Sequence, residues 1–187
     1  MRWYSLLALA MAACPAAALA QTPSYSNVGR VPTAEELRAW DISVGPAGKE
    51  LPPGKGTSKE GAELYARKCV ACHGQNLEGG IGPRLMGGQG TLTTLHIQRS
   101  IGNYWPFATT LYDFINRAMP PQQGGSFKPD ELYSLVAFLL YKNEIIKEGD
   151  VMDAKSLPKI EMPNRNNFIP LWPVYDKNAK RPYGLYP

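Results

Sequence analysis

The chain has 187 residues, enough for one domain of ordinary size with extensions, and its 44% apolar and 19% charged residues are typical of a globular protein. Its 18 glycines and 17 prolines predict plentiful irregular backbone. A formal net charge of +4, with no basic stripe along the chain, is too small a bias to indicate a nucleic-acid-binding protein.

Residues 1–20 have the pattern of a secretory signal peptide. Arg2 gives a positive start, an apolar run covers 6–13, and small residues precede the expected mature N-terminus at Gln21. The apolar run is too short to cross a membrane comfortably, and no later segment resembles a transmembrane span. The alternative is a lipoprotein signal with Cys14 as the lipidated residue. The sequence therefore predicts export to the periplasm.

Residues 21–57 form a lead-in rich in proline and glycine. Thr33 and Glu36 have the spacing of a capping box, which predicts a short helix to about Trp40. A flexible linker is the simplest interpretation of such a segment, but a linker does not need its several large apolar residues. We therefore expect 21–57 to be an N-terminal extension that packs on the main domain.

The compact core is expected over residues 58–147. No sustained alternation with period two is visible, so this core should be all-α. The elements expected there, in chain order, are a helix that runs into Cys69, a glycine-rich loop over 74–90, and helices over 92–101, over 109–117 and from Pro129 onward.

Residues 148–187 are rich in proline and weakly periodic. They nevertheless contain large apolar residues, including Phe168 and Trp172. We interpret this segment as a C-terminal extension that lies over the core, and the alternative is a disordered end that orders on a partner.

The two cysteines beyond the signal, Cys69 and Cys72, lie in the pentapeptide Cys-Val-Ala-Cys-His, which ends at His73. One helical turn places residues three apart on the same side, near enough to bond the two vinyl-derived carbons of a haem, and the next histidine then lies under the iron. The pattern predicts one covalent haem c, attached through Cys69 and Cys72, with His73 as the proximal iron ligand.

Two other interpretations of the pentapeptide are weaker. A zinc site would need two more ligands, and His96 is the only histidine outside the motif. A thioredoxin-like redox pair would be expected after a strand in a βαβ unit, which this sequence does not contain.

Met119 is the expected distal iron ligand. It follows a predicted helix and precedes two prolines, which favour an extended loop able to present a thioether to the iron. It also lies far enough beyond His73 to approach from the opposite face, and a thioether ligand raises the reduction potential of the haem. Packing at a helix end is the simpler role for Met119. The other candidate ligands are Met86, His96, Met152 and Met162.

Three further residues are candidates for the haem environment. The backbone at Pro83 could accept the N–H of the proximal imidazole, and the simpler alternative is an ordinary Gly-Pro turn. Tyr104 and Trp105 could donate to a haem propionate, and the alternative is core filling.

The region 58–147 resembles the class I cytochromes c. In that family a small residue lets the first and last helices cross closely, a proline carbonyl bonds the proximal histidine, and a methionine is the distal ligand. The resemblance implies an all-α class I cytochrome c fold, with haem-wrapping helices and irregular N- and C-terminal extensions. The residues at matching positions are Gly61, Tyr65, Cys69, Cys72, His73, Pro83, Met119, Leu135 and Phe138.

A narrower resemblance covers most of the expected mature chain. Segments 102–120 and 157–165, joined by the short segments 28–30 and 45–48, are similar to cytochrome subunits of bacterial sulfur-compound dehydrogenases, including the sulfur dehydrogenase of the Sox system and related sulfite dehydrogenases. Some of those subunits carry two haems, but a single pentapeptide implies one.

The resemblance implies a periplasmic single-electron carrier that is not itself an enzyme. Its expected partners are a molybdenum-containing dehydrogenase subunit, which oxidises a sulfur compound, and a downstream cytochrome or oxidase. A free-standing shuttle is the alternative, and a ligand-binding haem enzyme or sensor is a further one. The long extensions favour a subunit, because a shuttle does not need them.

Overall fold

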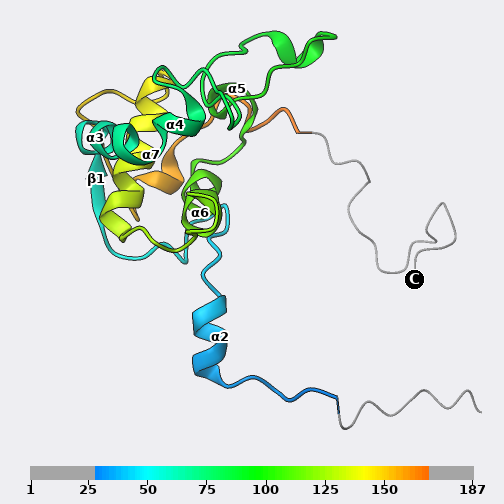
Figure 1. The fold of residues 1–187 in the computed structure, drawn as a ribbon, viewed down its shortest axis with the longest axis vertical. Helices are drawn as coiled ribbons and strands as arrows, with labels where there is room; N and C mark the ends of the chain where they lie inside the picture. Colours follow the sequence, from blue (N-terminus) through cyan, green and yellow to red (C-terminus); the bar gives the residue numbers. More distant parts are fainter. Residues whose placement is uncertain (1–27, 169–187) are drawn as a thin grey trace, which may run out of the picture. The chain divides into compact units, whose positions relative to one another are not determined.

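A computed structural model describes residues 28–168 (Figure 1). The predicted signal peptide, with Cys14, and residues 169–187 of the predicted C-terminal extension lie outside the described residues. The chain divides into two units, one that ends at Trp40 and one that begins at Asp41, and each is described by itself.

The first unit contains helix α2 (Ala34–Trp40). Its capping box is the one that the sequence predicted, since Glu36 N–H donates to Thr33 Oγ1 at 3.2 Å and Thr33 N–H donates to Glu36 Oε2 at 2.8 Å. Arg30 also forms a salt bridge with Glu36. These bonds satisfy backbone N–H groups that have no partner in the first helical turn, and they fix the start of the helix.

Helices α3 (Ser58–Lys68) and α7 (Pro129–Lys142) cross closely in the second unit. Gly61 permits this crossing, because a Cβ atom at that position would lie 1.9 Å from the carbonyl oxygen of Ser134. Beside it the rings of Tyr65 and Phe138 pack with their centroids 5.1 Å apart. The first and last helices of the core therefore meet over a glycine and an aromatic pair.

The other helices of the second unit are α4 (Val70–His73), α5 (Ile101–Tyr104), α6 (Ala108–Ala118) and the 3-10 turns η1 (Thr91–Thr93) and η2 (Leu157–Lys159). Helix α6 packs against α7, and the chain leaves α6 at Met119. The predicted all-α core is thus confirmed. No helix within residues 28–168 is both long enough and apolar enough to cross a membrane.

The predicted helix over 92–101 is wrong. The chain forms η1 there, then an irregular loop, and enters α5 only at the end of that range. Threonine hydroxyls explain the difference, because Thr91 Oγ1 donates to the carbonyl of Gly88 at 2.6 Å and accepts from Gln98 N–H at 3.0 Å. Such side-chain bonds to nearby backbone compete with helical hydrogen bonds. His96 is consequently an exposed loop residue and not a helical one.

Strands from both ends of the second unit pair beside the helices. Strand β1 (Lys55–Thr57) runs antiparallel to β2 (Val151–Asp153) in a two-stranded sheet. Apolar side chains within β2 and in the segments that flank the two strands are buried in the core, and they are Val44, Leu51, Met152, Leu157 and Met162. The division of the chain into 21–57, 58–147 and 148–187 stays a prediction.

Candidate haem-binding site

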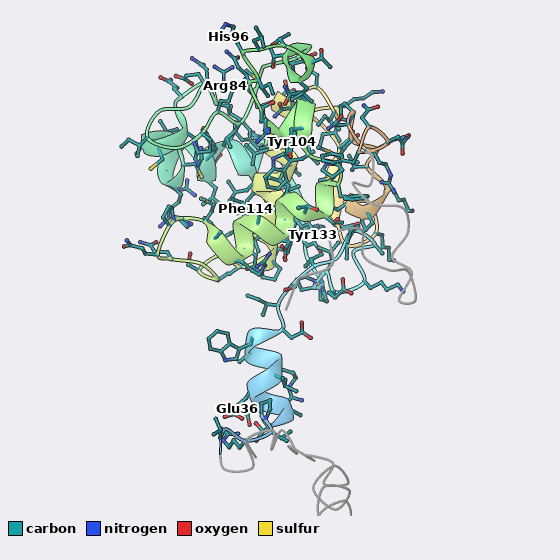
Figure 2. All side chains as sticks on the ribbon, turned by 90° about the vertical axis from the view of Figure 1, so that its right-hand side faces the viewer. Glu36, Arg84, His96, Tyr104, Phe114 and Tyr133 are labelled. Atoms are coloured by element: carbon teal, nitrogen blue, oxygen red, sulfur yellow. The ribbon has the colours of Figure 1, made fainter. Side chains whose placement is uncertain are left out.

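A mostly apolar cavity of about 480 Å³ lies among α3, α4, α5, α6 and α7. The fold brings all seven predicted site residues to its wall, and these are Cys69, Cys72, His73, Pro83, Tyr104, Trp105 and Met119. They come from the junction of α3 and α4, from α4 and the loop that follows it, and from the C-terminal ends of α5 and α6 with the residues directly after them. Figure 2 shows two of the lining side chains, Tyr104 and Phe114, in the same part of the second unit.

The pentapeptide begins where α3 ends. Cys69 N–H donates to the carbonyl of Tyr65 at 2.9 Å, and His73 N–H donates to the carbonyl of Cys69 at 2.9 Å, so Cys69 and Cys72 span one helical turn. Both cysteines are free thiols and half-buried. Burial, together with the neighbouring Cys72, raises the pKa of the Cys69 thiol to about 11, so this sulfur is uncharged at neutral pH. An uncharged thiol is a poor redox nucleophile.

The geometry also bears on the zinc interpretation. Among residues 28–168, no three His, Cys, Asp or Glu side chains come together in a way that could hold a metal ion. His96 does not line the cavity, and Figure 2 shows it at the edge of the molecule, apart from Tyr104. The described part of the chain therefore offers the pentapeptide no additional zinc ligands.

The ring of His73 is oriented by the loop that follows α4. Its Nδ1 lies 2.8 Å from the carbonyl oxygen of Pro83. A carbonyl can only accept, so Nδ1 carries the proton and Nε2 keeps its lone pair. Gly82 allows this approach, because a Cβ atom there would lie 2.8 Å from His73 Cε1. The arrangement leaves Nε2 as the nitrogen available to a metal.

Met119 caps the C-terminal end of α6. Its backbone is extended, and its N–H donates to the carbonyl of Ile115 at 3.1 Å. It lines the cavity together with the two prolines that follow it, whereas Met86, Met152 and Met162 do not. Met152 and Met162 are instead buried in the core on their own segments. Within the described residues, Met119 is therefore the one methionine positioned to meet a ligand in this cavity.

Tyr104 and Trp105 contribute aromatic surface to the cavity. The edge of Trp105 packs on the ring of Phe114, with centroids 5.6 Å apart. Tyr104 meets Phe168 with centroids 5.5 Å apart, and the guanidinium of Arg99 lies 4.9 Å from the centre of its ring. Both residues thus pack against neighbours while they face the cavity.

Sequence reasoning missed three cationic residues of this wall, Lys68, Arg84 and Arg99. No aspartate or glutamate lines the cavity, and none of the three cations forms a salt bridge within the described chain. Lys68 directly precedes Cys69, so the sequence alone could have placed it beside the cysteines. Arg84 and Arg99 lie in irregular segments, where no periodic pattern indicates which way a side chain points.

The lining fits a haem c in shape and in chemistry. Two thiols, an oriented imidazole and a thioether are the groups that would bind it, and the remaining wall is apolar, as a porphyrin requires. The guanidinium groups of Arg84 and Arg99 provide positive charge for its two carboxylates. No residue of the wall carries a charge that would repel those carboxylates.

Comparison with known proteins gives three matches. Residues 56–139 match the family described as cytochrome c oxidase, cbb3-type, subunit III. Over 29 residues the chain is 59% identical to cytochrome c-551 of Bacillus subtilis (strain 168), a match that covers 16% of this chain and 26% of that protein. The chain thus spans about a quarter of the curated relative that it matches.

The third match is to a solved structure. The chain is 38% identical to a chain in the crystal structure of the sulfane dehydrogenase SoxCD from Paracoccus pantotrophus, with a TM-score of 0.71. This match covers 76% of the present chain and 71% of that chain. It therefore extends well beyond residues 56–139 and includes parts of the flanking segments.

Proposed function

Because the chain belongs to the class I c-type cytochromes, which carry covalent haem c and transfer electrons, we propose that it is the cytochrome subunit of a dehydrogenase for sulfur compounds. The observation that supports this assignment is the similarity to a chain of the sulfane dehydrogenase SoxCD, which includes segments outside the cytochrome core. Sulfite, thiosulfate or sulfane sulfur would be the source of the electrons.

We assign the site residues as follows. Cys69 and Cys72 form the two thioether bonds, His73 supplies Nε2 as the proximal ligand, and Met119 supplies the distal sulfur. Pro83 holds the imidazole in one tautomer through its carbonyl oxygen. When bound, the haem would supply the reversible one-electron couple of its iron. With His73 and Met119 as its two axial ligands, the site would favour electron transfer over substrate binding.

Arg84 and Arg99 are assigned to the haem carboxylates. The two cysteines would attach one edge of the porphyrin, so its carboxylates would face the wall away from the cysteines. The guanidinium of Arg99 lies 4.9 Å from the centre of the Tyr104 ring, and both residues line the cavity. A guanidinium fixed on an aromatic ring loses little conformational freedom when it binds a carboxylate, which makes Arg99 the stronger anchor.

The protein is proposed to act in the periplasm, as its N-terminal sequence indicates. Its electron donor would be a molybdenum-containing dehydrogenase subunit, and its acceptor a downstream cytochrome or an oxidase. The chain itself would not be the enzyme, since with His73 and Met119 both bound to the iron the haem would have no open position for a substrate. The long flanking segments support a lasting subunit over a freely diffusing shuttle, because a shuttle does not need them.

The test is purification of the native protein from the periplasmic fraction, followed by stopped-flow absorption of its haem. We expect it to elute as a complex larger than the 20.6 kDa of the whole chain and to be reduced when sulfite, thiosulfate or a sulfane-sulfur compound is added. Elution as a monomer that sulfur compounds do not reduce, with rapid oxidation by a terminal oxidase, would instead identify a free-standing shuttle. Fast binding of CO to the reduced protein would indicate a ligand-binding haem.

A further inference from the structure

Helix α6 has two occupied faces. One face lines the cavity through Leu111, Phe114 and Ile115, and the chain then continues to Met119. The other face carries Thr109 and Asp113, which are buried although they are polar. Buried polar groups need hydrogen-bond partners, so the partners of these two residues show what holds α6 from behind.

Those partners belong to the segment that precedes the cytochrome core. Val44 N–H donates to Asp113 Oδ1 at 2.8 Å, and Thr109 Oγ1 donates to the carbonyl of Pro46 at 3.2 Å. We call residues 44–51 the brace. Both of its polar contacts with α6 are made by its backbone, which fixes the position of the brace independently of its side chains.

Gly48 shows how closely the brace is packed. Its φ angle is +64°, and a Cβ atom there would lie 2.6 Å from Pro158 and 3.3 Å from the side chain of Thr109. Pro158 is part of η2, which itself packs against α6. The brace is therefore held between α6 and η2, and it cannot move away from α6 without displacing η2.

Asp113 connects the brace to the last turn of α6. Besides the Val44 N–H, it binds Arg117, whose Nε donates to Asp113 Oδ1 at 2.9 Å and whose Nη2 makes a salt bridge with the second oxygen. Arg117 lies two residues before Met119. The Asp113 side chain is 10% exposed and that of Arg117 is 46% exposed. The hydrogen bond from the Val44 N–H is therefore shielded from water, in surroundings where hydrogen bonds to a charge are stronger, and the ion pair with Arg117 is partly open to solvent.

We propose that Asp113 is a positioning residue for Met119: by joining the brace to Arg117 it fixes the last turn of α6 and so holds the thioether against the haem iron. The inference rests on the proposed function, in which Met119 is the distal ligand. Under this proposal, residues N-terminal to the haem domain control the strength of an iron–sulfur bond that they do not touch.

The test compares Asp113→Ala with Asp113→Asn in the haem-loaded protein. The alanine variant leaves the Val44 N–H and Arg117 without their acceptor, so we expect a weaker far-red Met–Fe(III) absorption band, cyanide binding several-fold faster and a lower midpoint potential. The asparagine variant keeps one oxygen for the Val44 N–H and should recover much of the wild-type behaviour. Haem content and helical circular dichroism should remain those of the wild type.

Asp130→Ala is the matched control. Asp130 also accepts a backbone N–H from the N-terminal side, that of Lys55 at 2.8 Å, but it lies on α7 and not on the helix that leads to Met119. It should leave the far-red band and the cyanide rate unchanged. Equal acceleration of cyanide binding in Asp113→Ala and Asp130→Ala, or no acceleration in either, would overturn the proposal.

Thr109→Val covers the case in which Asp113→Ala does not fold. It removes the hydroxyl that bonds Pro46 and keeps the side-chain shape, so it should accelerate cyanide binding in the same direction by a smaller factor. No acceleration in this folded variant would also count against the proposal. A wild-type protein without the far-red band would show something different, namely that Met119 is not the distal ligand.

Discussion

The thioether of Met119 stands at the end of α6, on the cavity wall. Replacing it with alanine should open one axial position of the iron, because no other methionine of the described chain lines the cavity. We expect Met119→Ala to lose the far-red band, to bind CO and cyanide, and to have a lower midpoint potential, since a soft thioether favours Fe(II).

Met86→Leu is the control for that experiment. Met86 was a rival ligand, and it packs against the core without lining the cavity. A swap that conserves volume costs less than about 1.5 kcal/mol and should leave the spectrum and the midpoint potential alone. The reverse result, a changed spectrum in Met86→Leu and none in Met119→Ala, would reassign the ligand.

A second prediction concerns Arg99, whose positive charge is proposed to pair with a haem carboxylate. Arg99→Gln should lower the midpoint potential, since a positive charge near the iron favours the reduced form. It should also make the potential depend on pH in the mildly acidic range, because the carboxylate loses the partner that keeps its pKa low. Potentiometric titration at several pH values measures both effects.

Lys68→Gln serves as the comparison for Arg99→Gln. It removes the same charge from the same cavity, but next to the cysteine edge and away from the expected carboxylates. Its potential should therefore show no new dependence on pH. If the two variants have identical pH profiles, Arg99 is not the carboxylate anchor.

Tyr133 gives a prediction about pH and stability. Its hydroxyl donates to the carbonyl of Pro52 at 2.8 Å, and burial, with the nearby Asp153, raises its pKa to about 12. A phenol in the unfolded chain ionises near about pH 10. The folded state holds this proton more tightly, so the stability it contributes is complete below that pH and is lost as the pH rises toward 12.

Tyr133→Phe should consequently lower the free energy of unfolding at neutral pH by about 1 kcal/mol, and the deficit should shrink above pH 10 or so. Urea unfolding at neutral pH and again above about pH 10 measures this difference in the free energy of unfolding. Tyr112→Phe is the matched variant, because its ring lies 4.9 Å from that of Tyr133 and its buried hydroxyl has no hydrogen-bond partner in the described residues. Tyr112→Phe should leave the free energy of unfolding at neutral pH unchanged. A constant deficit for Tyr133→Phe across this range would contradict the assignment of the pKa.

Local patterns in the sequence predicted site residues that the fold brings to one cavity, because the contacts among most of them are local. Cys69, Cys72 and His73 lie within one helical turn, and the bond from His73 to Pro83 spans only ten positions. The arginines were missed because their importance depends on where an irregular loop directs them. Asp113 was missed for a related reason: its partner Val44 is 69 positions away, and no short pattern reports such a contact.

At the scale of elements, capping signals were the reliable ones. Thr33 and Glu36 form the predicted capping box of α2, and α7 begins at Pro129 as expected. The helix predicted over 92–101 was wrong because the pattern of apolar residues does not show that side-chain hydroxyl groups will bond to the nearby backbone. The contacts of Thr91 with Gly88 and Gln98 replace the helix there.

The close crossing of α3 and α7 leads to a prediction about stability. Gly61→Ala should destabilise the fold by roughly 1–3 kcal/mol or more, because the added Cβ would lie 1.9 Å from a backbone oxygen that no rotamer can move. Chemical denaturation followed by circular dichroism measures this. Gly149→Ala is the control, since its Cβ position has no neighbour within 4 Å. Equal midpoints for the two variants would mean that the helices are not packed as closely as described.

At the scale of the whole molecule, the second unit is closed by segments from both of its ends. The antiparallel pair of Lys55–Thr57 and Val151–Asp153 joins residues that lie about a hundred positions apart in the chain, and the brace is held against η2. The hydrophobic periodicity of the sequence predicted neither the strand pair nor the position of the brace. Packed extensions were expected only because these segments contain large apolar residues. The strands are three residues long, too short to show an alternation.

The cavity among the helices has a consequence for how the protein is made. Its wall includes Leu111, Leu135 and Leu139, side chains that in a protein without a cofactor would close on one another as a core. Until a porphyrin covers them, their contact with water costs about 25 cal/mol for each Å² left exposed. A newly made chain that waits for its haem should therefore be loosely folded and open to proteases. The amount of mature protein that a cell accumulates would then follow its supply of haem more closely than its supply of polypeptide.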